Sequence, residues 1–253
     1  MLYKIKNIFN ITVFTIVLLY FVQFVFLHHV AAGNWVETHT RPYLIQSDFL
    51  RYLFFLNGSG DGRYELLGSS TDEILIELDY QAGFEPELFI EEALARSVRE
   101  ATGKSAKIIV DEDPDIPSFE SFVNRQLEIT FSETEDEVPS SDQVYIHVLY
   151  LSSSTNEEYL MGQTFSANKM VIYKSALNEV NKSSEIRKKL EESMFKYNLG
   201  ELLGLPLINR DGCVMHQYTP IASFEKVDGK NIATEYCVES LVKLEAYQKK
   251  AGR

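Results

Sequence analysis

The alternation of hydrophobic and polar residues predicts the strands and helices of a mixed α/β domain. Residues 73–80 (Glu-Ile-Leu-Ile-Glu-Leu-Asp-Tyr) form a strand pattern bounded by polar residues. Pro86 then introduces a helix that runs to about Thr102 and stops at Gly103, because proline suits the first helical turn and glycine suits the position after the last. A second strand is expected at residues 107–111.

The following hundred residues contain the strongest strand pattern of the chain. Residues 144–151 (Val-Tyr-Ile-His-Val-Leu-Tyr-Leu) are almost entirely apolar, and shorter strands at 162–167 and 170–173 are placed to form a hairpin around Asn168. Residues 119–130 fit a helix and a strand equally well.

A long helix is expected from Ser183 or Ser184, which are good N-caps, to about Leu203. Its second half is apolar nearly all round, which predicts that this end is buried. One face of the helix combines apolar residues with a single carboxylate: Ile186, Leu190, Met194, Tyr197 and Glu201. Two interpretations of Glu201 stay open, because a buried carboxylate needs a partner. It lines a cleft beneath Tyr197, or it pairs with a group such as Arg210.

The end of this helix has the spacing of a zinc-protease motif without its histidines. The pattern H-E-x-x-H-x-x-G-x-x-H, followed by a turn that contains methionine, fits when its glycine is placed at Gly204. Met215 then stands at the methionine of that turn. The chain therefore resembles the metzincin clan, in particular its archaemetzincin-like and matrixin-like members. Over residues 72–247 the resemblance implies a zincin-type α/β sandwich, with a mixed, mostly parallel sheet and long helices.

The same alignment places residues of the wrong chemistry at the metal positions. Tyr197 and Glu201 stand at the first two histidines, Leu207 at the third, and Asn198 at the catalytic glutamate. A catalytic zinc needs three protein donors and an open position for water. Only Glu201 would bind zinc well, so we expect no metal and no zinc catalysis at these positions.

The remaining histidines give no ligand pattern, since no two are spaced four residues apart. His147 lies inside the strongest strand among apolar neighbours and is not expected to bind zinc. His216 follows Met215 and could approach the cleft. An active enzyme with the unusual ligand set Glu201, His216 and Tyr197 remains an alternative, and zinc would be its cofactor.

An apolar run precedes the domain. Residues 8–27 would span about 30 Å as a helix, the thickness of the hydrocarbon core of a bilayer. Lys4 and Lys6 stand before it, which places the N-terminus in the cytoplasm and the rest outside. We therefore predict an anchor within residues 1–32, a juxtamembrane segment at 33–70 and an extracytoplasmic domain at 71–253. A signal cleaved after Val30-Ala31-Ala32, giving a secreted protein, is the alternative.

The net charge and the cysteine content bear on the possible partners and on a possible disulfide. A net charge of -13 argues against nucleic acid as a partner. Cys213 and Cys237 are the two cysteines, and either a disulfide or two buried thiols is compatible with their positions. The leading hypothesis is a membrane-anchored pseudo-metalloprotease that binds a peptide or protein in a cleft lined by Tyr197, Glu201, Met215 and His216. A purely structural ectodomain is the third hypothesis.

Overall fold

A computed structural model describes most of the region after residue 70 and a few residues before it. The described residues are 14–15, 17–23, 25, 40, 66–68, 71–113, 116–117, 119–140, 142–153, 160–180, 183–216 and 232–250. The chain divides into two compact units, residues 1–59 and 60–253. The predicted boundaries at 32 and 70 stay predictions.

The prediction of a single-pass membrane protein is wrong. Within the part of the chain that the structure describes, no helix is both long and apolar enough to cross a bilayer. Of the predicted span 8–27, the structure describes residues 17–23 together with residues 14–15 and 25. The remainder of that span beyond residues 14–15 and 25, and the predicted cleavage site at 30–32, lie outside the described residues.

Five strands form one sheet in the described region, in the order β2-β1-β3-β5-β4. The central strands pair in parallel, and only β4 runs antiparallel, against β5. The strands are β1 (Glu73–Tyr80), β2 (Ser105–Glu112), β3 (Gln143–Leu151), β4 (Gly162–Ser166) and β5 (Lys169–Tyr173). The prediction of a mixed, mostly parallel sheet is confirmed.

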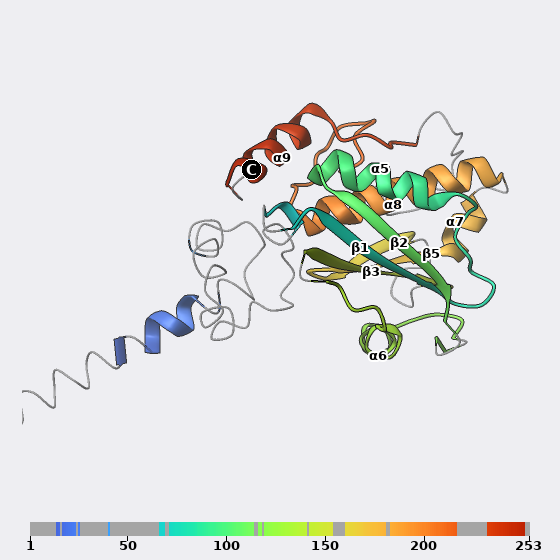
Figure 1. Ribbon diagram of the computed structural model, residues 1–253, viewed down its shortest axis with the longest axis horizontal. Coiled ribbons are helices and arrows are strands. Elements are labelled where there is room, and N and C mark those ends of the chain that lie inside the picture. Colours follow the sequence, from blue (N-terminus) through green and yellow to red (C-terminus); the bar gives the residue numbers. More distant parts are fainter. Residues whose placement is uncertain are drawn as a thin grey trace, which may run out of the picture. The chain divides into compact units, whose positions relative to one another are not determined.

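Helices cover both faces of the sheet (Figure 1). On one face α5 and α8 pack side by side, and α9 contacts α5. On the other face lies α6 alone among the labelled helices. The bounds are α5 (Ile90–Thr102), α6 (Asn124–Thr134), α7 (Lys174–Val180), α8 (Ser184–Leu202) and α9 (Val238–Lys250).

Each face of the sheet has its own hydrophobic core, because side chains alternate along a strand. The larger core joins Ile76 of β1 and Val148 of β3 to α5, α8 and α9. The smaller core joins Leu149 and Leu151 of β3 to Phe131 of α6. The central strands β1 and β3 are therefore buried on both sides, which explains their apolar sequences.

Most predicted elements are present, and the differences have local causes. The hairpin of β4 and β5 is confirmed. The ambiguous segment becomes α6, whose start is capped by the bond from the Val123 N–H to the Gln126 side chain at 2.8 Å. The first helix begins at Ile90 rather than near Pro86, because Phe89 before it takes a left-handed conformation with φ of 61°.

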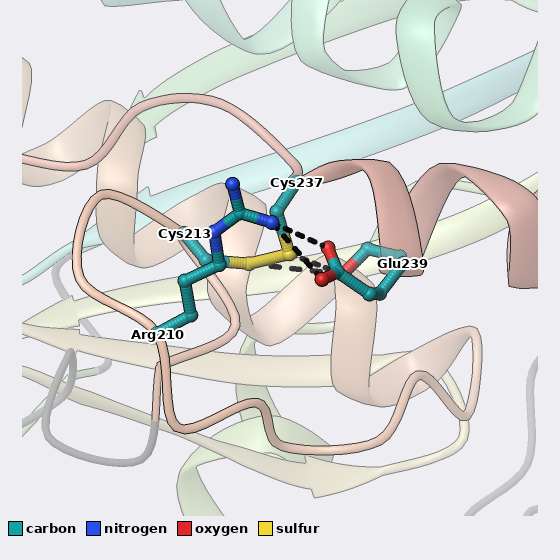
Figure 2. The surroundings of a disulfide bond; sticks show 5 residues. Arg210, Cys213, Cys237 and Glu239 are labelled. Atoms are coloured by element: carbon teal, nitrogen blue, oxygen red, sulfur yellow. Dashed lines mark hydrogen bonds and ion pairs between the residues drawn. A yellow bond between two sulfur atoms is a disulfide. The ribbon is translucent and has the colours of Figure 1, made fainter.

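A disulfide joins Cys213 to Cys237, which settles the alternative left open by the sequence (Figure 2). It ties the segment after α8 to the start of α9. Beside it, the Arg210 guanidinium contacts the Glu239 carboxylate at 2.9 and 3.1 Å. Arg210, one of the possible partners of Glu201, is therefore paired with Glu239 instead.

Candidate functional site

The predicted site at the end of α8 is mostly buried, and its members do not converge on one point. Tyr197 is buried, Asn198 is fully buried and Leu207 is 53% exposed. The Asn198 amide donates to the Val171 carbonyl of β5 at 3.4 Å. Its side chain therefore faces the sheet, while Leu207 faces solvent.

Glu201 is held by two hydroxyl groups. The Thr164 hydroxyl of β4 donates to Glu201 Oε2 at 2.9 Å, and the Tyr197 hydroxyl also bonds the carboxyl group. Burial raises the pKa of Glu201, and these two bonds partly offset that effect. The same burial, with Glu201 nearby, raises the pKa of Tyr197. Glu201 and Tyr197 thus form a hydrogen-bonded pair beside strand β4.

Near this pair, α8 is in close contact with the segment that follows it. Met215 is fully buried, and a Cβ built on Gly200 would lie 2.3 Å from its sulfur atom. Gly204 has φ of 68°, the left-handed conformation that ends helices, as the sequence predicted. His216 follows Met215, and its Nε2 lies 4.0 Å from an Asp211 oxygen.

The side chains at the end of α8 do not form a zinc site. The Asn198 amide faces a carbonyl, and Leu207 has no donor atom. Glu201 is the one strong ligand, and its carboxyl group already binds two hydroxyls. His216 belongs to no group of three histidine, cysteine or acidic side chains with metal-like spacing among the residues described.

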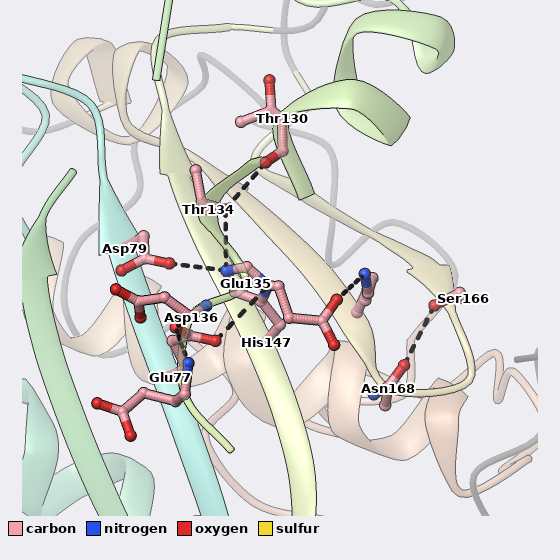
Figure 3. A network of polar contacts seen from close by, with 11 residues as sticks. Glu77, Asp79, Thr130, Thr134, Glu135, Asp136, His147, Ser166 and Asn168 are labelled. Atoms are coloured by element: carbon pink, nitrogen blue, oxygen red, sulfur yellow. Dashed lines mark hydrogen bonds and ion pairs between the residues drawn. The ribbon is translucent and has the colours of Figure 1, made fainter. Parts of the chain in front are cut away.

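A second polar cluster lies on the opposite face of the sheet, beneath α6 (Figure 3). Glu77 of β1 is the direct register partner of His147 of β3, and Asp79 lies two residues further along β1 on the same face. One donor atom from each of the three side chains lies within 4.8 Å of the other two. Their side chains are at most 4% exposed, so the cluster is inside the domain.

Hydrogen bonds account for only part of this cluster. His147 Nε2 lies 2.8 Å from Asp79 Oδ2 and 3.3 Å from the Thr134 hydroxyl of α6. Glu77 Oε1 accepts the N–H groups of Asp136 and Glu137, each at 3.1 Å. Within the described region, Glu77 Oε2 and His147 Nδ1 have no hydrogen-bond partner, and they lie 3.9 Å apart.

The electrostatics show a shortage of positive charge. Burial, together with the neighbouring carboxylates of Asp136 and Asp79, raises the pKa of Glu77 to about 8. Burial also raises the pKa of Asp79, although its bond to His147 opposes the shift. A cation bound among these groups would offset both effects.

The expectation that the chain has no metal cofactor is therefore wrong, because the described residues include a buried group that can hold a metal ion. Two features of the sequence point to this cluster. Glu77 and Asp79 are acidic residues in a strand whose other face is apolar, and His147 interrupts an apolar strand. What the sequence did not show was that these two strands are neighbours in parallel register.

A pocket of about 410 Å³ adjoins the cluster. Asp136 and Glu137, whose N–H groups bind Glu77, are among its lining residues, so one layer of chain separates the pocket from Glu77. Its walls combine acidic and apolar side chains with one lysine: Ser132, Glu135, Asp136, Glu137, Val138, Pro139 and Lys169.

No protein-family model and no curated protein matches this chain. Its fold is similar to that of archaemetzincin. The archaemetzincin of Methanopyrus kandleri is 14% identical, with 70% of this chain and 97% of that chain covered and a TM-score of 0.49. A zinc-dependent peptidase of Methanocorpusculum labreanum is 12% identical, with 67% and 99% covered and a TM-score of 0.44.

Proposed function

We propose that this chain binds one divalent metal ion of the zinc class at Glu77, Asp79 and His147, and that this ion serves a hydrolytic reaction. The observation that carries the proposal is the pair of unpartnered atoms, Glu77 Oε2 and His147 Nδ1, both buried and 3.9 Å apart. Buried polar atoms are almost always hydrogen-bonded, and an exception needs an explanation. A cation between the two atoms supplies one.

The ligand types favour a transition metal over magnesium or calcium. Imidazole nitrogen suits zinc, copper, iron and nickel, whereas magnesium and calcium take oxygen ligands. One imidazole with carboxylates, as in His147 with Glu77 and Asp79, belongs to the first group. Three protein groups leave a position for water, and a zinc ion in such a site lowers the pKa of its water.

The protein's own groups have separate tasks in this proposal. Asp136 and Glu137 fix the Glu77 carboxylate through their N–H groups, and Asp79 fixes the His147 ring. The rings of Phe131 and Tyr145 pack around His147, at 5.0 and 6.0 Å between centroids, and keep bulk water away. The ligand set is thus non-standard and lies on the face of the sheet opposite α8.

The test is the metal content of the full chain purified without chelators. We expect about one zinc-class ion per chain, and we expect Glu77→Gln to lose it. Glu73→Gln is the matched control, because Glu73 lies on the same strand and the same face, at the far end. Hydrolysis of a pool of unstructured peptides, followed by mass spectrometry, should stop with chelator and in Glu77→Gln. A chain that binds no such ion would rule out the proposal, and binding without turnover would rule out its hydrolytic part.

A second candidate is the binding of a peptide along β4 without cleavage. Two observations favour it: β4 is the last strand of the described sheet, and Thr164 within it holds Glu201 of α8. An extended peptide can add to such an edge and bind through main-chain hydrogen bonds. Peptide binding that persists in Glu77→Gln and weakens in Thr164→Pro would favour this candidate. Loss of binding in Glu77→Gln would speak against it.

A further inference from the structure

We propose that the ion lies on the Nδ1 side of His147, between this nitrogen and Glu77 Oε2, with Asp136 reaching it from the adjoining pocket. In this arrangement Asp79 is a positioning residue that orients the imidazole ring from the other side. The inference rests on the proposed function, which assigns a metal to the cluster of Glu77, Asp79 and His147, and it refines that assignment by moving Asp79 out of the ligand set and Asp136 into it.

The first step is the position of the proton on His147. The Thr134 hydroxyl donates its only proton to the Thr130 carbonyl at 3.0 Å, so its oxygen can only accept from the histidine. The Asp79 carboxylate, 2.8 Å from the same ring nitrogen, is also an acceptor. Both neighbours of Nε2 thus require an N–H there (Figure 3). In the neutral ring, Nδ1 therefore carries the lone pair.

The second step is the distance between the two unpartnered atoms. Zinc lies about 2.0–2.2 Å from imidazole nitrogen and carboxylate oxygen. His147 Nδ1 and Glu77 Oε2 are 3.9 Å apart, close to the sum of two such bonds. An ion therefore fits between them with small shifts of the side chains. Without a cation, Glu77 holds a proton at neutral pH, because its pKa is raised to about 8, and a bound ion would displace that proton.

The third step is the role of Asp79. A histidine that binds a metal usually donates its other N–H to a carboxylate, which fixes the ring and raises its basicity. The bond from His147 Nε2–H to Asp79 has this form. Asp79 is thereby assigned to the outer side of the ring, even though it belongs to the same cluster of donors.

The fourth step is Asp136, which connects the cluster to the pocket. Its side chain is exposed and lines the pocket, and its carboxylate also contacts the Glu77 carboxyl group. It is not among the donors that lie within 4.8 Å of one another, so its side chain would have to turn inward from the pocket to become a third ligand beside Glu77. The remaining position of the ion would then lie on the side of the pocket, behind the chain at Asp136 and Glu137.

The assignment is tested on the full chain with zinc and cadmium as probes. Nitrogen-15 NMR of the histidines in the metal-free protein should show His147 as the neutral Nε2–H tautomer. On adding metal, the ligation shift should appear on Nδ1, with Nε2–H retained. Asp79→Asn should weaken zinc binding by about 10–100-fold, as is usual for a group behind a ligand.

The variant Asp136→Asn tests whether Asp136 binds the ion or only lines the pocket. It keeps the backbone N–H that binds Glu77, so the fold should persist. We expect zinc affinity to fall by about tenfold or more, and association in stopped-flow mixing to slow. Glu133→Gln, an exposed carboxylate on α6, removes the same charge and should leave both unchanged.

The outcomes distinguish the inference from the proposed function. Metal binding with the ligation shift on Nε2, or with Asp136→Asn indistinguishable from Glu133→Gln, would overturn the inference and leave the metal site standing. Absence of metal binding in the unaltered chain would remove both.

Discussion

The sulfur atom of Met215 occupies the space that a side chain at Gly200 would need, 2.3 Å from the position of its Cβ atom. This contact fixes the end of α8 against the segment that carries the disulfide. Tyr236 also borders the site, 3.3 Å from the same position, and its hydroxyl donates to the Lys196 carbonyl at 2.7 Å. The packing here depends on a residue without a side chain.

We predict that Gly200→Ala lowers the free energy of unfolding by about 1–3 kcal/mol, because the added methyl group overpacks the site. A loss of stability would identify the crowding at this site, because the same change in an uncrowded helix raises the free energy of unfolding by up to about 1 kcal/mol. Urea denaturation measures the effect. Lys189→Ala, partly exposed on the same helix, should change stability by less than about 0.5 kcal/mol. A gain of stability in Gly200→Ala would contradict the contact.

Metal addition should affect the native protein and Glu77→Gln differently. In chelator, the variant should be at least as stable as the unaltered chain, because its amide can donate to His147 Nδ1. With zinc at a hundred times its dissociation constant, the unaltered chain should gain about 2.7 kcal/mol and the variant should gain little. Urea denaturation with and without zinc checks this, and equal gains in both proteins would contradict it.

A buried carboxylate on α8 should make stability depend on pH. Burial raises the pKa of Glu191 from 4.5 to about 7, against the opposing effect of Lys174. The folded chain then binds more protons than the unfolded chain between these values, so this stabilisation is complete below pH 4.5 and is lost as pH rises to 7. Relative to Glu191→Gln, the unaltered chain should lose up to about 3 kcal/mol over that window.

Urea denaturation at intervals between pH 4 and 8 measures this difference. Glu185→Gln, an exposed change on the same helix, should give a curve parallel to that of the unaltered chain. If the unaltered chain instead gains stability over Glu191→Gln as pH rises, Glu191 is ionised throughout by its contact with Lys174.

Replacing both Cys213 and Cys237 with serine should lower the free energy of unfolding by about 3 kcal/mol in the chain-entropy treatment of a loop of this length. The two residues are separated by 24 positions. Reductant should bring the unaltered chain to the stability of the double variant and should leave that variant unchanged. A reductant effect of similar size on the variant would show that it acts elsewhere.

Sequence reasoning located most of the secondary structure because the central strands are strongly patterned. The runs that became β1 and β3 are apolar enough to be buried on both faces. Residues 119–130 stayed ambiguous because their apolar positions fit both the helical period and the strand period. The helix was decided by tertiary packing of Leu127 and Phe131 against the sheet.

The candidate metal site could not be found in the same way. Glu77 and His147 are seventy residues apart, and only the parallel pairing of their strands makes them neighbours. Each one, taken alone, is an ordinary polar residue in a strand. The metzincin motif takes its first two ligands from one helix, whereas the candidate donors here come from two strands.

The placement of Glu77 and His147 on separate strands affects when an ion could be bound and how it could be released. An unfolded chain offers no preformed chelate, so the proposed ion would not guide early folding and would be acquired after the sheet and α6 have assembled. Once enclosed, it would leave only when that assembly opens. Its exchange with the surrounding metal pool would then be governed by local unfolding rather than by the strength of the individual bonds.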